Sequence, residues 1–587
     1  MSCFIKKNII LFCVSVALFS GIALKAQKPE FIMDMVHHNP GEALAKSAFT
    51  NPEYVKSSGF NVQVMNDFIF PTAAVSFDSF DATIFPKGSK DREWLDAATL
   101  QIQNNIKAAH AAGIKVFYFT DIVVLPKKIV EKYKDQLSDS CGKISFEKPL
   151  TVELHKIMFE ELFQKFPDLD GLVIRTGETY LNNVPYHTGN NPICDGARSH
   201  IKLLNLLRDE VCVKHNKTVI YRTWSIGGFH NDPEYYLQVS DKVEPHNKLV
   251  FSIKHVQGDY QRTYPFNPCL GIGKHRQVVE VQCQREYEGK GAYPDYVMNG
   301  VINGFEEYDT KVHPNCLNDI KNNPNFAGIY SWSRGGGWVG PFISNEFWPR
   351  LNAYVLSAWA NNPKLSEEAA FNRFMDEQGI KLTKSRSAFR KLSLLSAKAV
   401  LRGHMSAKLT LKPDWAFWMR DHFLAGIEKP DTKEEKQFPS EGFLYDEFSE
   451  FYKTGTLKTA VAEKQEAVQF WDSIVSLSKL VKSTHPQDDK YIRVSSLYGL
   501  YLHRIIASGW QVMALGFEGD QTGRYNKPAI RNAIKEYDKS WIDYENLKKK
   551  EPSCASLYKP YAFIFIGPDY YSKKGMSNSV DKYRKLK

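Results

Sequence analysis

Short runs of β-branched and aromatic residues alternate with longer amphipathic stretches from residue 31 to about residue 345. The eight runs that predict strands are Phe31–Val36, Asn61–Met65, Lys115–Thr120, Gly171–Arg175, Thr218–Thr223, Leu249–Lys254, Val278–Cys283 and Phe326–Ser331. Apolar residues recur with helical spacing between them, as in Glu93–Ala112, Thr151–Phe166 and Ile201–His215. Parallel strands need such crossovers, and doubly wound sheets usually have fewer strands. The pattern therefore predicts a (β/α)8 barrel.

The pattern changes after residue 363, where strand signals end. Long amphipathic stretches follow at 364–379, 388–401, 459–480 and 492–515, with proline-containing loops near 429–440 and 485–487. We therefore divide the chain into a catalytic barrel at 27–363 and an α-helical C-terminal domain at 364–587. We expect these helices to pack against the side of the barrel or to supply a residue to its rim.

The N-terminal segment has the pattern of a secretory signal. Lys6 and Lys7 precede an apolar run that ends at Leu24, and the small residue Ala26 follows. This run is too short for a comfortable membrane span, and no later stretch is long and apolar enough. We predict a signal peptide at 1–26 and an exported protein, periplasmic or extracellular, that is soluble after cleavage.

Composition limits the partners and cofactors of the chain. Nine cysteines are scattered without a C-x-x-C pair, and the adjacent His37 and His38 of a strand would point to opposite faces. We therefore expect no metal and no cofactor. The net charge of +10 is spread along the chain rather than gathered in basic blocks, which argues against a nucleic-acid partner and mildly suits an anionic substrate. The oligomeric state stays open.

Carboxylates follow three of the predicted strands. Glu178 comes after the fourth strand, Asp259 after the sixth and Glu286 after the seventh. Catalytic groups of such barrels sit at the C-terminal strand ends, and glycosidic bond cleavage needs one carboxylic acid and a second carboxylate. The alternatives are that Glu178 pairs with Arg175 or caps a helix, and that Asp259 is a turn residue.

Polar residues alternate along the seventh strand. Glu280, Gln282, Gln284 and Glu286 share one face, which a barrel would tolerate only as an inward-facing polar row. Because a buried charge is costly unless it is paired or used, a site explains the row better than packing does. Glu288 has the same parity and competes with Glu286 for the catalytic role.

Cations end three consecutive predicted strands. Arg175, Arg222 and Lys254 could converge on one side of the mouth and bind the carboxylate of an acidic sugar, or they could balance the three acids. Tryptophans near the same rim could stack against sugar rings, or they could be core aromatics; they are Trp224, Trp332 and Trp338.

At these residues the chain resembles glycoside hydrolase family 67, the α-glucuronidases that release glucuronic or 4-O-methylglucuronic acid from xylan fragments. Residues 253–261, Ile-Lys-His-Val-Gln-Gly-Asp-Tyr-Gln, are similar to the family's Ile-Lys-Asn-Gly-Pro-x-Asp-Phe-Gln. Residues 280–289, Glu-Val-Gln-Cys-Gln-Arg-Glu-Tyr-Glu-Gly, are similar to its Glu-x-Gln-x-x-Gln-Glu-Tyr-x-Gly. Gly337–Gly340 and Ala358–Trp359 are similar to its Asn-Trp-x-Gly and Leu-Ala-Trp.

The resemblance implies roles for several residues. Asp259 and Glu286 would act together on the water, and Tyr287 would belong to the substrate site. The family's general acid ends Lys-Ala-Asn-Ser-Glu, for which the counterpart here is Arg175-Thr-Gly-Glu178. Arg222 and Lys254 are implied to hold the uronate. The family's N-terminal β-domain has no counterpart in this sequence, which makes the chain similar to a distant branch.

These observations predict an exo-acting glycoside hydrolase that releases a terminal uronic acid from an acidic oligo- or polysaccharide with inversion. Two alternatives remain. One is a hydrolase of different sugar specificity with a retaining pair, Glu178 and Glu286, and the other is a non-catalytic glycan-binding relative. The carboxyl separation would distinguish the mechanisms, because inversion needs roughly 6.5–9.5 Å and retention roughly 5–5.5 Å.

Overall fold

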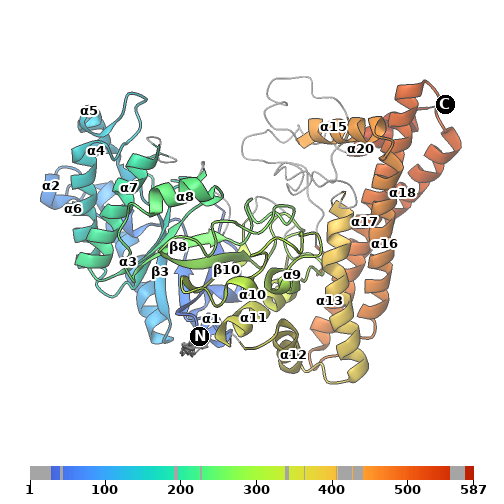
Figure 1. Cartoon of the computed structure of the whole chain (residues 1–587), viewed down its shortest axis with the longest axis horizontal. Coiled ribbons are helices and arrows are strands. Elements are labelled where there is room, and N and C mark those ends of the chain that lie inside the picture. Colours follow the sequence, from blue (N-terminus) through green and yellow to red (C-terminus); the bar gives the residue numbers. More distant parts are fainter. Residues whose placement is uncertain are drawn as a thin grey trace, which may run out of the picture.

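The computed structural model describes most of the chain outside its N-terminus. The described residues are 28–39, 44–190, 196–224, 228–336, 343–362, 364–404, 406, 426–427, 440–555 and 576–586. The predicted signal peptide at 1–26 lies outside them. Figure 1 shows two parts, a barrel with its surrounding helices and a group of long helices built from the C-terminal third.

Eight parallel strands close into a barrel, which confirms the predicted fold. They pair in the order β1-β10-β9-β8-β7-β5-β3-β2 and back to β1. Their bounds are β1 (Phe31–His37), β2 (Val62–Met65), β3 (Lys115–Asp121), β5 (Gly171–Arg175), β7 (Thr218–Arg222), β8 (Leu249–Lys254), β9 (Arg276–Gln282) and β10 (Phe326–Gly335).

Alternation along each strand separates two cores. In β1, Phe31, Met33 and Met35 belong to the cluster inside the barrel, whereas Ile32 and Val36 belong to the larger cluster between the barrel and its helices. The same period of two places Val278 of β9 inside the barrel. Glu280 and Gln282 share this inward parity and are fully buried, as the polar row in the sequence predicted.

Crossover helices connect most of the strands. They are α1 (Pro52–Ser57), α2 (Asp78–Asp81), α3 (Lys90–Ala111), α4 (Lys127–Lys132), α5 (Lys134–Leu137), α6 (Pro149–Lys165), α7 (Gly196–Leu206), a π-helical turn at Leu207–Lys214, α8 (Pro233–Ser240), α9 (Met298–Asn303) and α10 (Leu317–Ile320). Residues 255–275, between β8 and β9, are described throughout and contain no helix. This long loop carries Asp259.

The segments that follow β3 and β5 form a small second sheet. Its strands β4 (Val124–Pro126) and β6 (His187–Gly189) pair in an antiparallel manner. The sequence did not predict this sheet, because a three-residue strand is too short to show an alternating pattern.

Long helices form the C-terminal part. They are α12 (Glu367–Glu377), α13 (Thr383–His404), α15 (Ser440–Lys453), α16 (Leu457–Ser478), α17 (Pro486–Thr522), α18 (Lys527–Lys550) and α20 (Met576–Arg584). The preceding helix, α11 (Phe347–Asn361), packs against β10 and belongs to the barrel. α17 begins at a proline, and Gly523, the residue that follows it, closes the helix in the left-handed conformation with a φ of 69°. No helix among the described residues is long and apolar enough to cross a membrane.

Helices α11 and α17 hold the segment that follows β9. In α11, Asn352 is buried and donates hydrogen bonds to the carbonyl oxygens of Cys283 and Asp295, at 3.0 and 2.9 Å. Trp348 of the same helix donates to Ser495 of α17 at 3.0 Å. α11 therefore holds the segment 283–295, which contains Glu286, and α17 of the C-terminal part contacts α11 in turn.

Candidate active site

Glu178 lies just beyond the end of β5. Thr176 and Gly177 carry the chain from Arg175 to this residue, whose side chain is open to water. The surrounding protein still removes part of its hydration, and this desolvation raises the pKa of Glu178 above the ordinary value. The negative charge of Asp259 adds to the rise, and the Arg175 guanidinium opposes it. The charge of Asp259 therefore acts on the carboxyl of Glu178.

Asp259 follows β8 and is held by two donors. The Nζ of Lys254 donates to its Oδ1, and the hydroxyl of Tyr287 donates to its Oδ2 at 2.5 Å. Burial by itself would raise the pKa of Asp259, but the charge of Lys254 and the two hydrogen bonds outweigh it and hold the pKa below the ordinary value. Asp259 is therefore kept as a carboxylate.

Glu286 is held by Gln282, the last residue of the preceding strand β9. The Gln282 amide accepts from the backbone N–H of Glu286 at 2.7 Å and donates to its Oε2 at 3.0 Å. Gly336, after β10, lies against the same pair: a Cβ at this position would be 2.5 Å from Nε2 of Gln282 and 2.7 Å from Oε2 of Glu286. The Gln282 amide and the absence of a side chain at Gly336 thus both help to set the position of the Glu286 carboxylate.

Each of the three predicted cations has a carboxylate partner. Arg175 forms two hydrogen bonds with Asp121, at 2.5 and 2.8 Å, and Lys254 binds Asp259. Arg222 binds Glu280, with its shortest contact at 2.6 Å. Only Lys254 pairs with one of the three candidate acids, whereas Arg175 and Arg222 pair with carboxylates outside that set. Their buried side chains are at most 3% exposed.

Glu280 is buried inside the barrel and binds three side chains there. Besides Arg222, it accepts from Ser252 at 2.8 Å and from the hydroxyl of Tyr260. Glu288, the competitor of Glu286, turns away into a buried ion pair with Arg285. Of the three carboxylates in residues 280–289, Glu280 and Glu288 thus form buried ion pairs with Arg222 and Arg285.

The predicted tryptophans have different surroundings. Trp332 is only 5% exposed and stacks on His37 with ring centroids 4.4 Å apart, so it forms the floor of the mouth. Trp224 is half-buried, with the Nζ of Lys254 3.7 Å from its ring centroid. Tyr287 binds Asp259, as described above. Trp338 lies outside the described residues.

Three residues of the site were not predicted as site residues: Gln282, Asp121 and His37. Gln282 was identified only as part of the inward row, although its spacing of four residues from Glu286 was a usable signal. Asp121 ends β3, but nothing in the sequence indicated that Arg175 on the neighbouring strand would bind it. His37 ends β1, and burial first and then the charge of Arg175 lower its pKa well below the ordinary value, which keeps the ring neutral.

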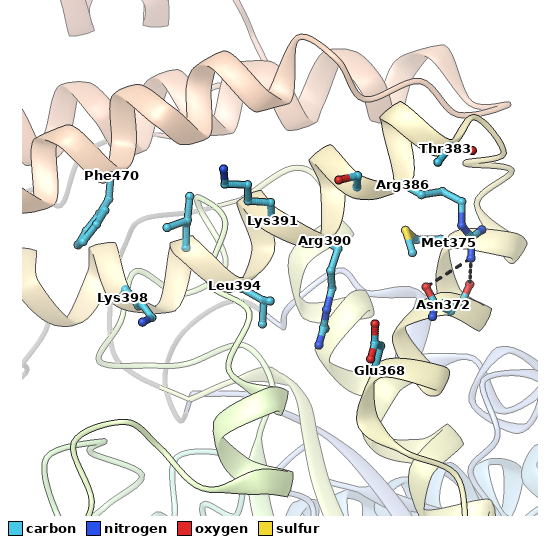
Figure 2. A pocket seen from close by; sticks show the side chains of 12 residues that line it. Glu368, Asn372, Met375, Thr383, Arg386, Arg390, Lys391, Leu394, Lys398 and Phe470 are labelled. Carbon is cyan, nitrogen blue, oxygen red and sulfur yellow. Dashed lines mark hydrogen bonds between the residues drawn. The ribbon is translucent and has the colours of Figure 1, made fainter.

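A pocket of about 760 Å³ lies elsewhere, between α12, α13 and α16 (Figure 2). Arg386 and Arg390 line it beside apolar residues such as Leu394 and Phe470. Both arginines are paired, with Asp376 and Glu367 respectively. No candidate catalytic carboxylate lines this pocket.

The described residues contain no group of three or more side chains that could hold a metal ion, and six described cysteines are free: 141, 212, 269, 283, 316 and 554.

Comparisons with known proteins find similarity in structure only. No family model and no curated protein match the sequence. A GH138 enzyme targeting pectin rhamnogalacturonan II is similar with a TM-score of 0.53 and 14% identity, over 95% of this chain and 67% of that chain. The O-GlcNAc hydrolase of Thermobaculum terrenum has a TM-score of 0.37 and 10% identity, over 95% and 94%. The similarity to the GH138 enzyme shows that this chain has the same fold as that enzyme.

Proposed function

We propose that the chain is a glycoside hydrolase in which Glu178 is the general acid and Asp259 and Glu286 are the base-side carboxylates. The observation that carries the proposal is the placement of three carboxylates after barrel strands, where Lys254 and Tyr287 hold Asp259 and Gln282 holds Glu286. The directions of the pKa shifts agree with this assignment. The pKa of Glu178 is raised and that of Asp259 is lowered. Environments that separate two carboxyl pKa values in this way create one proton donor and one base in the same site.

The proposed reaction follows from these protonation states. Glu178 donates its proton to the leaving glycosidic oxygen, while Asp259 and Glu286 orient a water molecule and accept its proton. The water attacks the anomeric carbon, and the bond to the leaving oxygen breaks. This assignment gives inversion. Lys254 and Tyr287 keep Asp259 ionised, and Gln282 fixes the direction of Glu286.

The finer proposal is that the released sugar is a terminal uronic acid. It rests on the similarity of residues 253–261 and 280–289 to glycoside hydrolase family 67 and on three cations in the wall of the mouth. One similar solved structure is that of a GH138 enzyme targeting pectin rhamnogalacturonan II. Removal of a sugar from a polysaccharide outside the cell would also suit the proposed export of the chain.

A neutral sugar is the second candidate, and the ion pairs favour it. Arg175, Arg222 and Lys254 are each matched by a carboxylate, and Glu178 and Glu286 add further negative charge. A substrate carboxylate would gain little from cations that are already paired, because their net field is small.

Two measurements test the mechanism. Proton NMR of the first product reports its anomeric configuration, and the opposite configuration to the substrate supports the assignment. Asp259→Ala and Glu286→Ala should each abolish hydrolysis. If Asp259→Ala stayed active while azide rescued Glu286→Ala and gave a covalent adduct of the opposite anomer, the chain would be a retaining hydrolase with Glu178 and Glu286.

A further inference from the structure

The two loops that carry Asp259 and Glu286 share a backbone feature. Beside each carboxylate stands a non-glycine residue with a positive φ: Tyr260 at 62° and Arg285 at 58°. Side-chain-bearing residues rarely adopt this conformation, and it persists only where the surroundings enforce it, often at active sites. Something must therefore hold both loops in place.

One side chain connects the two loops. Arg285, next to Glu286, donates from Nη2 to the carbonyl oxygen of Tyr260, next to Asp259, at 3.0 Å. The same nitrogen also binds Glu288. Arg285 is 1% exposed, so no water competes for these contacts. The guanidinium of Arg285, the neighbour of Glu286, thus holds the backbone of Tyr260, the neighbour of Asp259.

The surroundings of Arg285 argue against a role in stability alone. Its Nε and Nη1 are buried without a hydrogen-bond partner among the described residues. Asp295 lies nearby, and burial together with the charge of Glu288 raises its pKa well above the ordinary value. A buried guanidinium with unused donors contributes little to folding, because its lost hydration is only partly replaced.

We propose that Arg285 is a positioning residue that sets the separation of Asp259 and Glu286 by tying the loop after β9 to the loop after β8. This inference rests on the proposed function for its catalytic consequence, but its structural part can be tested without a substrate. In a reaction that needs two carboxylates on one water, misplacement by about 1 Å costs on the order of 100-fold in rate.

The test uses a charge-balanced double variant, Arg285→Met with Glu288→Gln, so that no unpaired charge is left buried. We expect kcat to fall about 100-fold while KM changes less than about threefold, because substrate contacts remain. The matched control is Arg390→Met with Glu367→Gln, which removes a partly buried ion pair of the helical part. It should lower Tm and leave kcat within about threefold. Equal kcat values for the two double variants would overturn the proposal.

Hydrogen exchange measured by mass spectrometry provides the readout that needs no activity. Peptides covering 257–263 and 283–290 should exchange faster in the Arg285→Met, Glu288→Gln variant, with strands β1 and β3 unchanged. Unchanged exchange in both peptides would overturn the positioning role. If the wild-type chain hydrolysed no glycan, the proposed function would fail, and the exchange result would still decide whether Arg285 ties the loops.

Discussion

A single methyl group at Gly336 should displace the catalytic carboxylate. An added Cβ would lie 2.7 Å from Oε2 of Glu286, and ordinary contact begins at 3.4 Å. Oε2 must therefore move by about 0.7 Å, and Nε2 of Gln282, at 2.5 Å, by about 0.9 Å. Since a shift of about 1 Å costs on the order of 100-fold, Gly336→Ala should lower kcat by roughly 10- to 100-fold.

The backbone adds a separate cost. Gly336 has a φ of +77°, and a left-handed conformation costs an alanine about 1–2 kcal/mol. Gly88 is a matched control, because its φ is +78° and nothing lies within 4 Å of the added Cβ. Gly336→Ala should lose at least as much stability as Gly88→Ala in thermal denaturation, because the close contacts add to the same backbone cost, but only Gly336→Ala should lose activity in steady-state kinetics. Equal kcat values for Gly336→Ala and Gly88→Ala would refute the assignment of Glu286.

Three further predictions concern protons. Tyr287→Phe removes a donor that lowers the pKa of Asp259, so the acidic limb of the kcat/KM profile should move to higher pH; an unmoved limb would contradict the base role. Glu178→Gln should lower kcat by roughly 10²–10⁴-fold for a poor leaving group and much less for a nitrophenyl glycoside, and equal losses would argue against a general acid. Burial raises the pKa of Asp34 to about 7, so the folded state binds this proton more tightly than the unfolded chain does and loses stability as pH rises from about 4 through 7. Asp34→Asn should therefore gain in Tm relative to the wild type between pH 5 and pH 8, and a constant difference would contradict the shift.

The barrel could be predicted from the sequence because its strands keep a local signal. All eight predicted runs overlap the observed strands, and the inward parity of Glu280 and Gln282 followed from alternation alone. Helix lengths were less accurate: α17 covers 37 residues, Pro486–Thr522, where the pattern indicated 492–515. Buried small residues such as Gly499 and Gly516 weaken the apolar period while still serving close helix packing.

The ion pairs of the mouth could not be predicted in the same way. Arg175 meets Asp121 across β5 and β3, 54 positions apart, and Arg222 meets Glu280 over 58 positions. Such contacts depend on barrel closure and on rotamers, about which a strand-end pattern says nothing. The sequence placed three cations at the mouth but could not show that each would be neutralised there. The left-handed backbone beside Asp259 also gave no signal, because Tyr260 is not a residue type that favours it.

The central claim is tested most directly by the sugar released from a panel of acidic and neutral oligosaccharides, compared between the wild-type chain and Glu286→Gln at equal concentration. We expect free uronic acid from the wild type and at most about 1% of that rate from the variant. Release of a neutral sugar alone would contradict the acidic-sugar proposal and leave the carboxylate assignment standing. No release of any sugar, or equal release by the two proteins, would contradict the account as a whole.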